Sequence, residues 1–373
     1  MYYPRIDLVV GTRPEAIKLA PVAAALAKAG RPPRLVFTGQ HPIDPADHGL
    51  AGFKRITLDC PGRRNPLAHS DAVAHAMASV LADPPALLPA MLVVQGDTSS
   101  ALGGAMAAHA AGIPIAHVEA GLRSFDPAMP WPEEANRVTI DRLSSLLLAP
   151  TATSAANLRA AGVAGEIVVT GNSGIDALFD ILDQLGPADQ LAASDRLRLL
   201  VTCHRRENWG RPMRAVAAAL NHLARLEIAT IRVVLHPNPV GAEAMRKAVK
   251  AGPGVELIAP LDHRQMIAEM RRADLMLSDS GGVQEEAPAL GVPLLVLRDK
   301  TERPEGIASG NMILAGTSRD KIVSLVIRLA DPAIRATMSQ PSLPFGDGKS
   351  GPRIAAAIEA WLARNRGTLR KAG

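Results

Sequence analysis

Short apolar runs separated by longer stretches with helical spacing recur along the whole chain. The first run, Ile6–Val10, has the pattern of a buried strand, and a helical pattern follows over Ala16–Ala29. Further strands are predicted at Arg34–Thr38, Met91–Gln95, Ile113–Val118 and Ser145–Ala149, with intervening helices at Ser100–Ala111 and Glu134–Leu143. This alternation predicts a parallel sheet, with ligands beyond the carboxyl ends of its strands.

The same alternation restarts after Val168–Asp176 and a linker-like stretch, Asp183–Asp195. Five more strands are predicted at Arg198–His204, Ile231–His236, Val255–Pro260, Asp274–Ser280 and Val292–Leu297, and a last helix at Ile354–Arg364. A chain of 373 residues exceeds the usual size of one domain. We therefore expect an α/β fold of two Rossmann-like doubly wound domains facing across a cleft. The predicted domains are residues 1–172, joined by a C-terminal helix at 353–373, and residues 173–352.

Composition narrows the class of protein. Apolar residues make up 47% of the chain and aromatic residues only 3%, so the core must be aliphatic. The net charge of +5 suggests an anionic partner, but scattered basic residues and few aromatics argue against nucleic acid and favour an acidic small molecule. Cys60 and Cys203 give no disulfide framework, which fits a reducing cytoplasm. We expect no signal peptide and no membrane span, because the apolar runs stop far short of the roughly 18 residues needed.

The loop "GTRPEAIK" after the first strand contains a helix start. Thr12 and Glu15 have capping-box spacing, and Pro14 suits a first helical turn. Arg13 and Lys18 add two cations near a helix N-terminus, where anions are already favoured. From these residues alone, a phosphate site and a simply well-capped helix both remain open.

The segment "DSGGVQEEAPALG" is a second loop of this kind. Ser280, Gly281 and Gly282 can present a hydroxyl group and backbone N–H groups to a diphosphate. Glu285 and Glu286 fall in the first helical turn, where they can complement the helix dipole or accept hydrogen bonds from ribose hydroxyls.

Four further segments carry acids or cations. Asp97 and Thr98 in "QGDTSSA" are ordinary N-cap residues, whereas Glu119 in "HVEAGLRS" lies where a loop has no structural need for a carboxylate. In "PWPEEANR" (Pro130–Arg137) the paired acids read locally as a helix start. His204, next to two arginines, is interpreted as an anion contact. No metal-ligand spacing and no serine-nucleophile motif are present in the sequence.

Taken together, these motifs resemble the non-hydrolysing UDP-N-acetylglucosamine (UDP-GlcNAc) 2-epimerases. The motifs occur in the family's order over about residues 6–350. They are "GTRPEAIKLAPV", "GDT", "HVEAGLRS…PWPEEANR", "TGNSGIDAL", "HRREN", "DSGGVQEEAPALGVPLLVLRDKTERPEG" and "PFGDG". The resemblance implies a glycosyltransferase-B-like fold, a UDP-sugar bound in the cleft and a homodimer. It also implies interconversion of UDP-GlcNAc and UDP-ManNAc, by elimination of UDP to 2-acetamidoglucal and re-addition, without a metal or other cofactor.

The family's functional positions map onto this sequence residue by residue. The resemblance implies acid–base roles for Asp97, Glu119 and Glu133. It also implies a catalytic role for His204, as a contact of the departing diphosphate. It also implies UDP-binding roles for a larger set: Arg13, Lys18, Leu261, Met266, Ser280, Gly281, Gly282, Glu286 and Arg303. Breaking the C1–O bond creates an oxocarbenium-like centre that carboxylates stabilise, and moving a proton between faces of C2 needs at least two carboxyl groups.

Several positions depart from the family's pattern. Gln95 stands where the family usually has histidine, and Pro237 stands where an aliphatic residue is common. Leu261 and Met266 occupy the uracil slot, where glutamine and an aromatic residue are typical.

A further departure lies in "GQHPIDP", where Pro42 and Asp44 replace residues of the family's regulatory site for a second UDP-GlcNAc. We therefore expect hyperbolic kinetics without an activator.

Three other functions are alternatives. A hydrolysing 2-epimerase of the same fold would release UDP and ManNAc. Because it shares the elimination step, residues alone discriminate it poorly, although the "PWPEEANR" segment favours the non-hydrolysing type. A glycosyltransferase would pass the sugar to an acceptor, but no acceptor-binding or membrane-facing patch is evident in the sequence. A UDP-sugar-binding protein without turnover would not require the three acids Asp97, Glu119 and Glu133.

Overall fold

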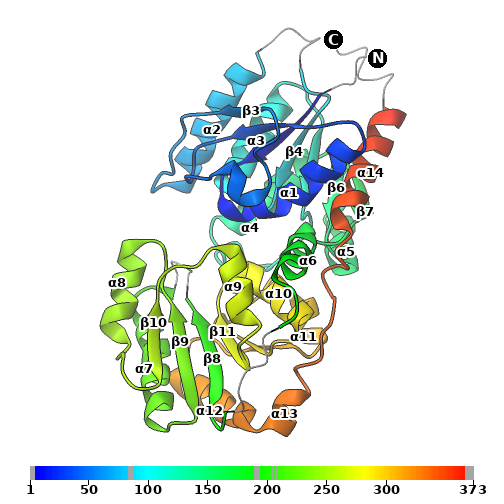
Figure 1. The fold of residues 1–373 in the computed structure, drawn as a ribbon. Helices are drawn as coiled ribbons and strands as arrows, with labels where there is room; N and C mark the ends of the chain where they lie inside the picture. The colour runs from blue at the N-terminus through cyan, green and yellow to red at the C-terminus, as the bar shows by residue number, and fades with distance from the viewer. Residues whose placement is uncertain (1–4, 83–87, 189–193, 204, 206–207, 366–373) are drawn as a thin grey trace. The chain divides into compact units, whose positions relative to one another are not determined.

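The computed structural model describes residues 5–82, 88–188, 194–203, 205 and 208–365, and divides the chain into two compact units (Figure 1). Unit 1 comprises Met1–Ala177 and Phe345–Gly373, and unit 2 comprises Leu178–Pro344. Each unit is a parallel sheet flanked by helices, so the α/β doubly wound fold expected from the sequence is confirmed.

The sheet of unit 1 has seven parallel strands in the order β3-β2-β1-β4-β5-β6-β7. The strands are β1 (Ile6–Val10), β2 (Arg34–Phe37), β3 (Arg55–Thr57), β4 (Met91–Gln95), β5 (Ile115–Val118), β6 (Leu146–Ala149) and β7 (Glu166–Val169). The helices are α1 (Arg13–Lys28), the 3₁₀ helix η1 (Pro45–His48), α2 (Pro66–Val80), α3 (Ser99–Ala110), α4 (Glu133–Leu143), α5 (Ala152–Ala160) and α14 (Ser350–Arg364). Helix α6 (Ser173–Leu185) begins in unit 1 and continues into unit 2. The strand order reverses between β1 and β4, which is where sheets of this class bind ligands.

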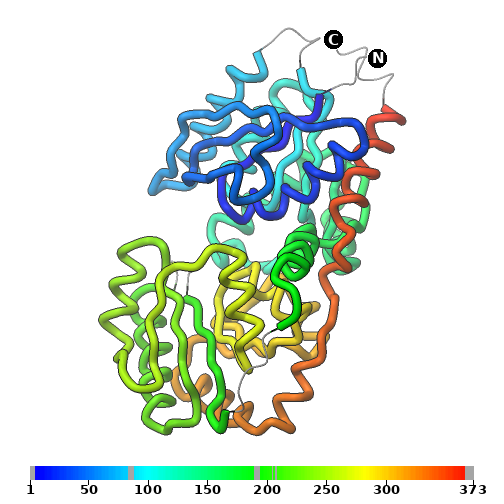
Figure 2. The backbone as a smooth tube through the Cα atoms, viewed as in Figure 1, coloured from blue at the N-terminus to red at the C-terminus, as the bar shows by residue number. Residues whose placement is uncertain are grey.

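The C-terminal segment of the chain belongs to unit 1. Helix α14, red in Figure 2, packs along α1, which is blue. The Asp176 carboxylate accepts the backbone N–H groups of Ser350 (3.0 Å) and Gly351 (2.7 Å), and the Asn172 N–H donates to the Phe345 carbonyl (2.7 Å). These contacts fasten the last helix to the start of α6.

The sheet of unit 2 has six parallel strands in the order β10-β9-β8-β11-β12-β13. The strands are β8 (Leu197–Thr202), β9 (Ala229–Val234), β10 (Val255–Ile258), β11 (Leu275–Ser278), β12 (Leu294–Val296) and β13 (Met312–Leu314). The helices are α7 (Arg211–Arg225), α8 (Pro239–Ala248), α9 (His263–Met270), α10 (Gly281–Leu290), α11 (Pro304–Ala308), α12 (Arg319–Ala330) and α13 (Pro332–Ala336). Here the order reverses between β8 and β11.

Three strands were not predicted from the sequence, and all three lie at sheet edges. β3 and β7 close the two sides of the first sheet, and β13 closes one side of the second. Edge strands are covered less than central ones, and β3 is only three residues long with its two end residues exposed. β13 also has only three residues, and the four residues of β7 begin with an exposed glutamate and end with an exposed valine, so none of these strands shows a long buried apolar run.

The cores are aliphatic, as the composition predicts. In unit 1, Leu8, Leu19 and Leu146 are fully buried, and in unit 2, Leu220 and Leu277 are. None of the helices among the described residues is long and apolar enough to cross a membrane.

Candidate functional site

The reversal point of unit 1 joins the loops that follow β1 and β4. Glu15 accepts the N–H groups of Gly11 (3.0 Å) and Thr12 (2.6 Å) with one oxygen, and the Thr98 hydroxyl (2.7 Å) with the other. Glu15 is almost completely buried, and burial raises its pKa to about 7 despite these hydrogen bonds. The capping glutamate predicted from the sequence therefore also ties two strand-end loops together.

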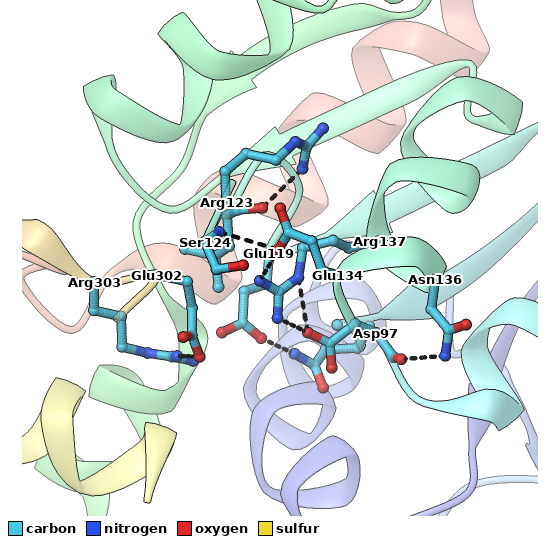
Figure 3. A network of polar contacts seen from close by, with 12 residues as sticks. Asp97, Glu119, Arg123, Ser124, Glu134, Asn136, Arg137, Glu302 and Arg303 are labelled. Carbon is cyan, nitrogen blue, oxygen red and sulfur yellow. Dashed lines mark hydrogen bonds and ion pairs between the residues drawn. The ribbon is translucent and has the colours of Figure 1, made fainter. Parts of the chain in front are cut away.

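Asp97 is held at three points by residues that follow it in the sequence (Figure 3). Arg137 donates Nε (3.0 Å) and Nη2 to its Oδ2 atom, and Asn136 donates Nδ2 to its backbone carbonyl (2.8 Å). His117 contacts the carbonyl of the preceding residue, Gly96, through Nε2 (2.8 Å). The Asp97 side chain keeps 24% of its surface exposed, so it is oriented and still accessible.

Glu119 follows β5 in a backbone conformation that non-glycine residues rarely adopt, with φ of 71°. Its Oε1 accepts Lys18 Nζ (2.7 Å) and its Oε2 accepts Gln95 Nε2. A Cβ atom placed on Gly96 would lie 3.6 Å from Glu119 Oε2, so this carboxylate lies against the residue before Asp97. A buried acid on a sparsely populated backbone conformation is typical of functional sites.

The adjacent acids of "PWPEEANR" form the first turn of α4 but have different surroundings. Glu134 is buried and accepts the backbone N–H groups of Ser124 (3.0 Å) and Phe125 (3.2 Å) together with Arg137 Nη1 (2.8 Å) (Figure 3). Glu133 is partly exposed. Glu134 thus has a structural role in ordering the loop, which leaves Glu133 as the candidate for chemistry.

The reversal point of unit 2 carries the glycine-rich loop. The Thr202 and Ser278 hydroxyls bond across it (2.6 Å), and Asp279 Oδ2 accepts the Arg205 N–H (3.0 Å) and Asn208 Nδ2 (2.7 Å). Ser280 is the N-cap of α10, and its side chain makes no capping hydrogen bond. Its hydroxyl and the first N–H groups of α10 therefore suit an external acceptor.

Arg303 lies directly beside this loop in a cation-rich cluster. It donates Nε to Glu285 Oε1 (2.7 Å) and also contacts Glu302, which pairs with Arg298 (2.8 Å) and Arg205 (3.7 Å). Burial lowers the pKa of Arg298 most strongly, Glu302 opposes this, and Arg205 and Arg303 lower it further. Three guanidinium groups therefore lie around Glu285 and Glu302 beside the glycine-rich loop.

The remaining UDP-binding candidates of unit 2 follow β10. Leu261 lies just before α9 and Met266 within it, and both are partly buried. His263 at the start of α9 pairs with Glu286 Oε1 (2.6 Å), so the proposed uracil slot and the proposed ribose contact belong to neighbouring helices. His204 lies outside the described residues.

Unit 1 therefore gathers Lys18, Asp97, Glu119 and the start of α4, with Arg13 exposed at the start of α1. Sequence reasoning assigned no role to His117 or Arg137. The available signals were a histidine inside an apolar strand and an arginine three residues after Glu134 on one helix face.

Asp44 caps η1 by accepting the Ala46 N–H (2.9 Å). Within the described ranges, no group of three or more His, Cys, Asp or Glu side chains is arranged to hold a metal ion.

Two parallel doubly wound sheets with polar groups at their reversal points define the class of doubly wound α/β proteins, which bind ligands at such points. The family model described as UDP-N-acetylglucosamine 2-epimerase matches residues 24–359, and the chain belongs to that family.

Similar proteins share nearly the whole chain. The UDP-N-acetylglucosamine 2-epimerase of Escherichia coli K12 is 38% identical over 375 residues, covering 95% of this chain and 98% of that protein. The crystal structure of the Neisseria meningitidis UDP-GlcNAc 2-epimerase bound to UDP-GlcNAc has a TM-score of 0.87 at 32% identity, covering 96% of this chain and 100% of that one. The Methanocaldococcus jannaschii enzyme in complex with UDP-GlcNAc and UDP has a TM-score of 0.83 at 32% identity, covering 95% and 99%.

Proposed function

We propose that this protein interconverts UDP-GlcNAc and UDP-ManNAc without hydrolysing them. In the first step a base removes the C2 proton, the C1–O bond breaks and UDP leaves with the bonding electrons, giving 2-acetamidoglucal. In the second step UDP adds back to C1 while an acid delivers a proton to the opposite face of C2. The products differ only in configuration at C2.

The acids of unit 1 suit this reaction. Proton removal on one face and delivery on the other require two carboxyl groups, and the developing positive charge at C1 requires a third negative group nearby. Asp97, Glu119 and Glu133 supply three. The observation that carries the proposal is that Asp97 and Glu119 lie next to each other, each oriented by a cation, Arg137 and Lys18 respectively.

The residues of unit 2 suit the UDP part. Ser280, Gly281 and Gly282 offer a hydroxyl and helix N-terminal N–H groups to the diphosphate, and Arg303 lies against Gly281. Glu286 and the pair Leu261 and Met266 are proposed for the ribose and uracil. His204 and Arg13 complete the proposed anion contacts.

Incubating the protein with UDP-GlcNAc in D2O and following the sugar by proton NMR tests the proposal. The expected result is UDP-ManNAc with deuterium at C2 of both epimers. Release of ManNAc and UDP would select the hydrolysing alternative. Transfer to an added acceptor with C2 still protonated would select a glycosyltransferase, and unchanged substrate would contradict the proposal.

From the family resemblance we also propose that the protein is a cytoplasmic homodimer. Its product would supply activated ManNAc for cell-surface polysaccharide. Both cysteines, Cys60 and Cys203, are buried free thiols, in keeping with a reducing compartment. Light scattering after size-exclusion chromatography tests the dimer, which a mass near 39.2 kDa would contradict.

A further inference from the structure

The ring of His117 is completely buried in β5 and both of its nitrogens face oxygen atoms. Nδ1 lies 2.7 Å from Asp141 Oδ1 on α4, and Nε2 lies 2.8 Å from the carbonyl oxygen of Gly96. Both distances are those of strong hydrogen bonds. Gly96 immediately precedes Asp97, so this buried ring contacts the loop that carries a candidate catalytic acid.

Neither neutral form of the ring satisfies both contacts. A neutral imidazole has one N–H donor and one lone pair. With the proton on Nδ1, the lone pair of Nε2 would face the Gly96 carbonyl oxygen. With the proton on Nε2, the lone pair of Nδ1 would face Asp141. Only the doubly protonated imidazolium donates to both oxygens.

Asp141 is ionised, and its negative charge favours a protonated ring at His117. Burial alone would raise its pKa, but the hydrogen bonds and charges of His117 and Arg123 hold the pKa below its ordinary value. Arg123 donates Nη2 to Asp141 Oδ2 (2.6 Å). Asp141 is therefore an ionised acceptor that contacts both Arg123 and the His117 ring.

The strand partners of His117 are apolar: Val94 on β4 and Leu147 on β6. The buried face of α3 consists of serine, alanine, glycine and leucine residues, and its His109 is exposed. On the far side of Gly96 lie Glu119, which is paired with Lys18, and Asp97, which is paired with Arg137.

We propose that His117 is a positioning residue that stays protonated and, as a buried imidazolium, fixes the Gly96–Asp97 peptide and thereby the Asp97 carboxylate. Asn136 holds the next carbonyl and Arg137 the carboxylate itself, so the loop is fixed at consecutive points. This inference rests on the proposed function, because it gives Asp97 a catalytic role. Groups that orient a reacting side chain in this way determine its geometry without touching substrate.

The protonation state can be measured without any turnover. Histidine-selective 15N labelling at pH 7, with the His117 signals identified by their loss in His117→Asn, should show protons on both ring nitrogens. A single ring proton would overturn the proposal.

Two variants separate the two hydrogen bonds. The amide nitrogen of glutamine is as far from Cβ, counted in bonds, as Nε2, so His117→Gln can still donate to Gly96. The amide nitrogen of asparagine corresponds to Nδ1, so His117→Asn can still donate only to Asp141. We expect kcat to fall about 10²-fold in His117→Asn and less than about 10-fold in His117→Gln, since misplacing a reacting group by about 1 Å costs about that much.

UDP affinity, measured by calorimetry, should be unchanged in both variants because the proposed UDP contacts, apart from Arg13 and Lys18, belong to unit 2. Equal kcat values in the two variants, or a loss of UDP affinity that parallels the loss of kcat, would overturn the positioning role. The 13C shift of the Gly96 carbonyl reports the same hydrogen bond directly and should be kept in His117→Gln and lost in His117→Asn. It thus decides this inference even if the unmodified protein shows no epimerase activity, a result that would contradict only the proposed function.

Discussion

The two units place polar side chains at the same position of the same fold, yet they differ in the groups that they offer to a ligand. At the reversal point of unit 1 the acids Asp97 and Glu134 share Arg137, and Glu119 is paired with Lys18. At the reversal point of unit 2, Arg303 lies beside a glycine-rich loop in which Ser280 makes no side-chain capping hydrogen bond. Unit 1 therefore suits proton transfer and cation stabilisation, and unit 2 suits binding of a diphosphate.

The difference teaches how one architecture supports two tasks. A parallel doubly wound sheet brings loops to the gap where its strand order reverses, whatever side chains they carry. The chemistry then depends on which residues the loops contain. The comparison predicts that substitutions in unit 1 change turnover or its pH dependence, whereas substitutions in unit 2 change UDP affinity.

The largest expected effect is that of Glu133→Gln. Removing a general acid or base costs about 10²–10⁴-fold in rate, so kcat should fall by that factor while UDP affinity stays within about twofold. Steady-state kinetics and calorimetry with UDP check this.

The neighbouring residue provides the control for that experiment. Glu134→Gln should chiefly destabilise the protein, by about 1–3 kcal/mol in urea unfolding, because buried N–H donors lose their charged acceptor. Unchanged turnover in Glu133→Gln, or a parallel loss of UDP affinity, would contradict the division of tasks between the units.

The next largest effect is a pH dependence of stability caused by Glu15. Its folded-state pKa of about 7 lies above the ordinary 4.5, so the folded protein holds a proton that the unfolded chain has lost between these values. Stability therefore falls as pH rises from about 4.5 to 7, by about 3 kcal/mol at ~1.36 kcal/mol per pH unit. Glu15→Gln mimics the protonated form and should lack this decline.

Urea unfolding of the wild type and Glu15→Gln at pH 5 and pH 8 measures the difference directly. The stability of the variant relative to wild type should be greater at pH 8 than at pH 5. The control Glu256→Gln, at an exposed glutamate of unit 2, should show the same change in unfolding free energy between the two pH values as the wild type. The same change in Glu15→Gln as well would refute the assignment to Glu15.

A smaller effect is expected from Gly282→Ala in unit 2. An added Cβ would meet no atom closer than the Ser280 hydroxyl oxygen at 4.0 Å, so stability should change by less than ~0.5 kcal/mol. The methyl group would obstruct the proposed diphosphate site, and UDP affinity should fall at least about tenfold, equivalent to ~1.4 kcal/mol.

Gly281→Ala is the matched comparison for this test. Its Cβ would lie 3.0 Å from Arg303 Nη1, so this variant should also lose stability by displacing the guanidinium group. UDP binding of wild-type strength in Gly282→Ala would show that the diphosphate does not bind at this loop.

The smallest effects are expected at exposed ion pairs away from both reversal points. Arg364 pairs with Glu166 in unit 1 and Arg196 with Glu227 in unit 2, each at 2.7 Å. Replacing either arginine by glutamine should change stability by less than about 1 kcal/mol, because solvent screens such pairs. Thermal unfolding checks this, and a clearly larger loss in one unit would mean that the units differ beyond their reversal points.

The sequence predicted most central strands and several caps. The alternation of apolar runs and helical spacing placed β1, β4 and β11, and the spacing of Thr12 and Glu15 indicated the start of α1. These features depend on neighbours within a few residues, so their signal is local. The edge strands β3, β7 and β13 were not predicted, because they are short and each pairs with only one neighbouring strand.

What the sequence alone determined is therefore the doubly wound fold, the family's motifs and the set of acids and cations at strand ends. Tertiary structure decided which of them meet. Arg137 reaches Asp97 across 40 residues, and Glu15 reaches Thr98 across 83, because the sheet places β4 between β1 and β5. It also separated the adjacent acids of "PWPEEANR": burial beside two backbone N–H groups gives Glu134 a structural role and leaves Glu133 partly exposed. Local spacing cannot make that distinction, because both acids occupy the same helical turn and only the packing around them differs.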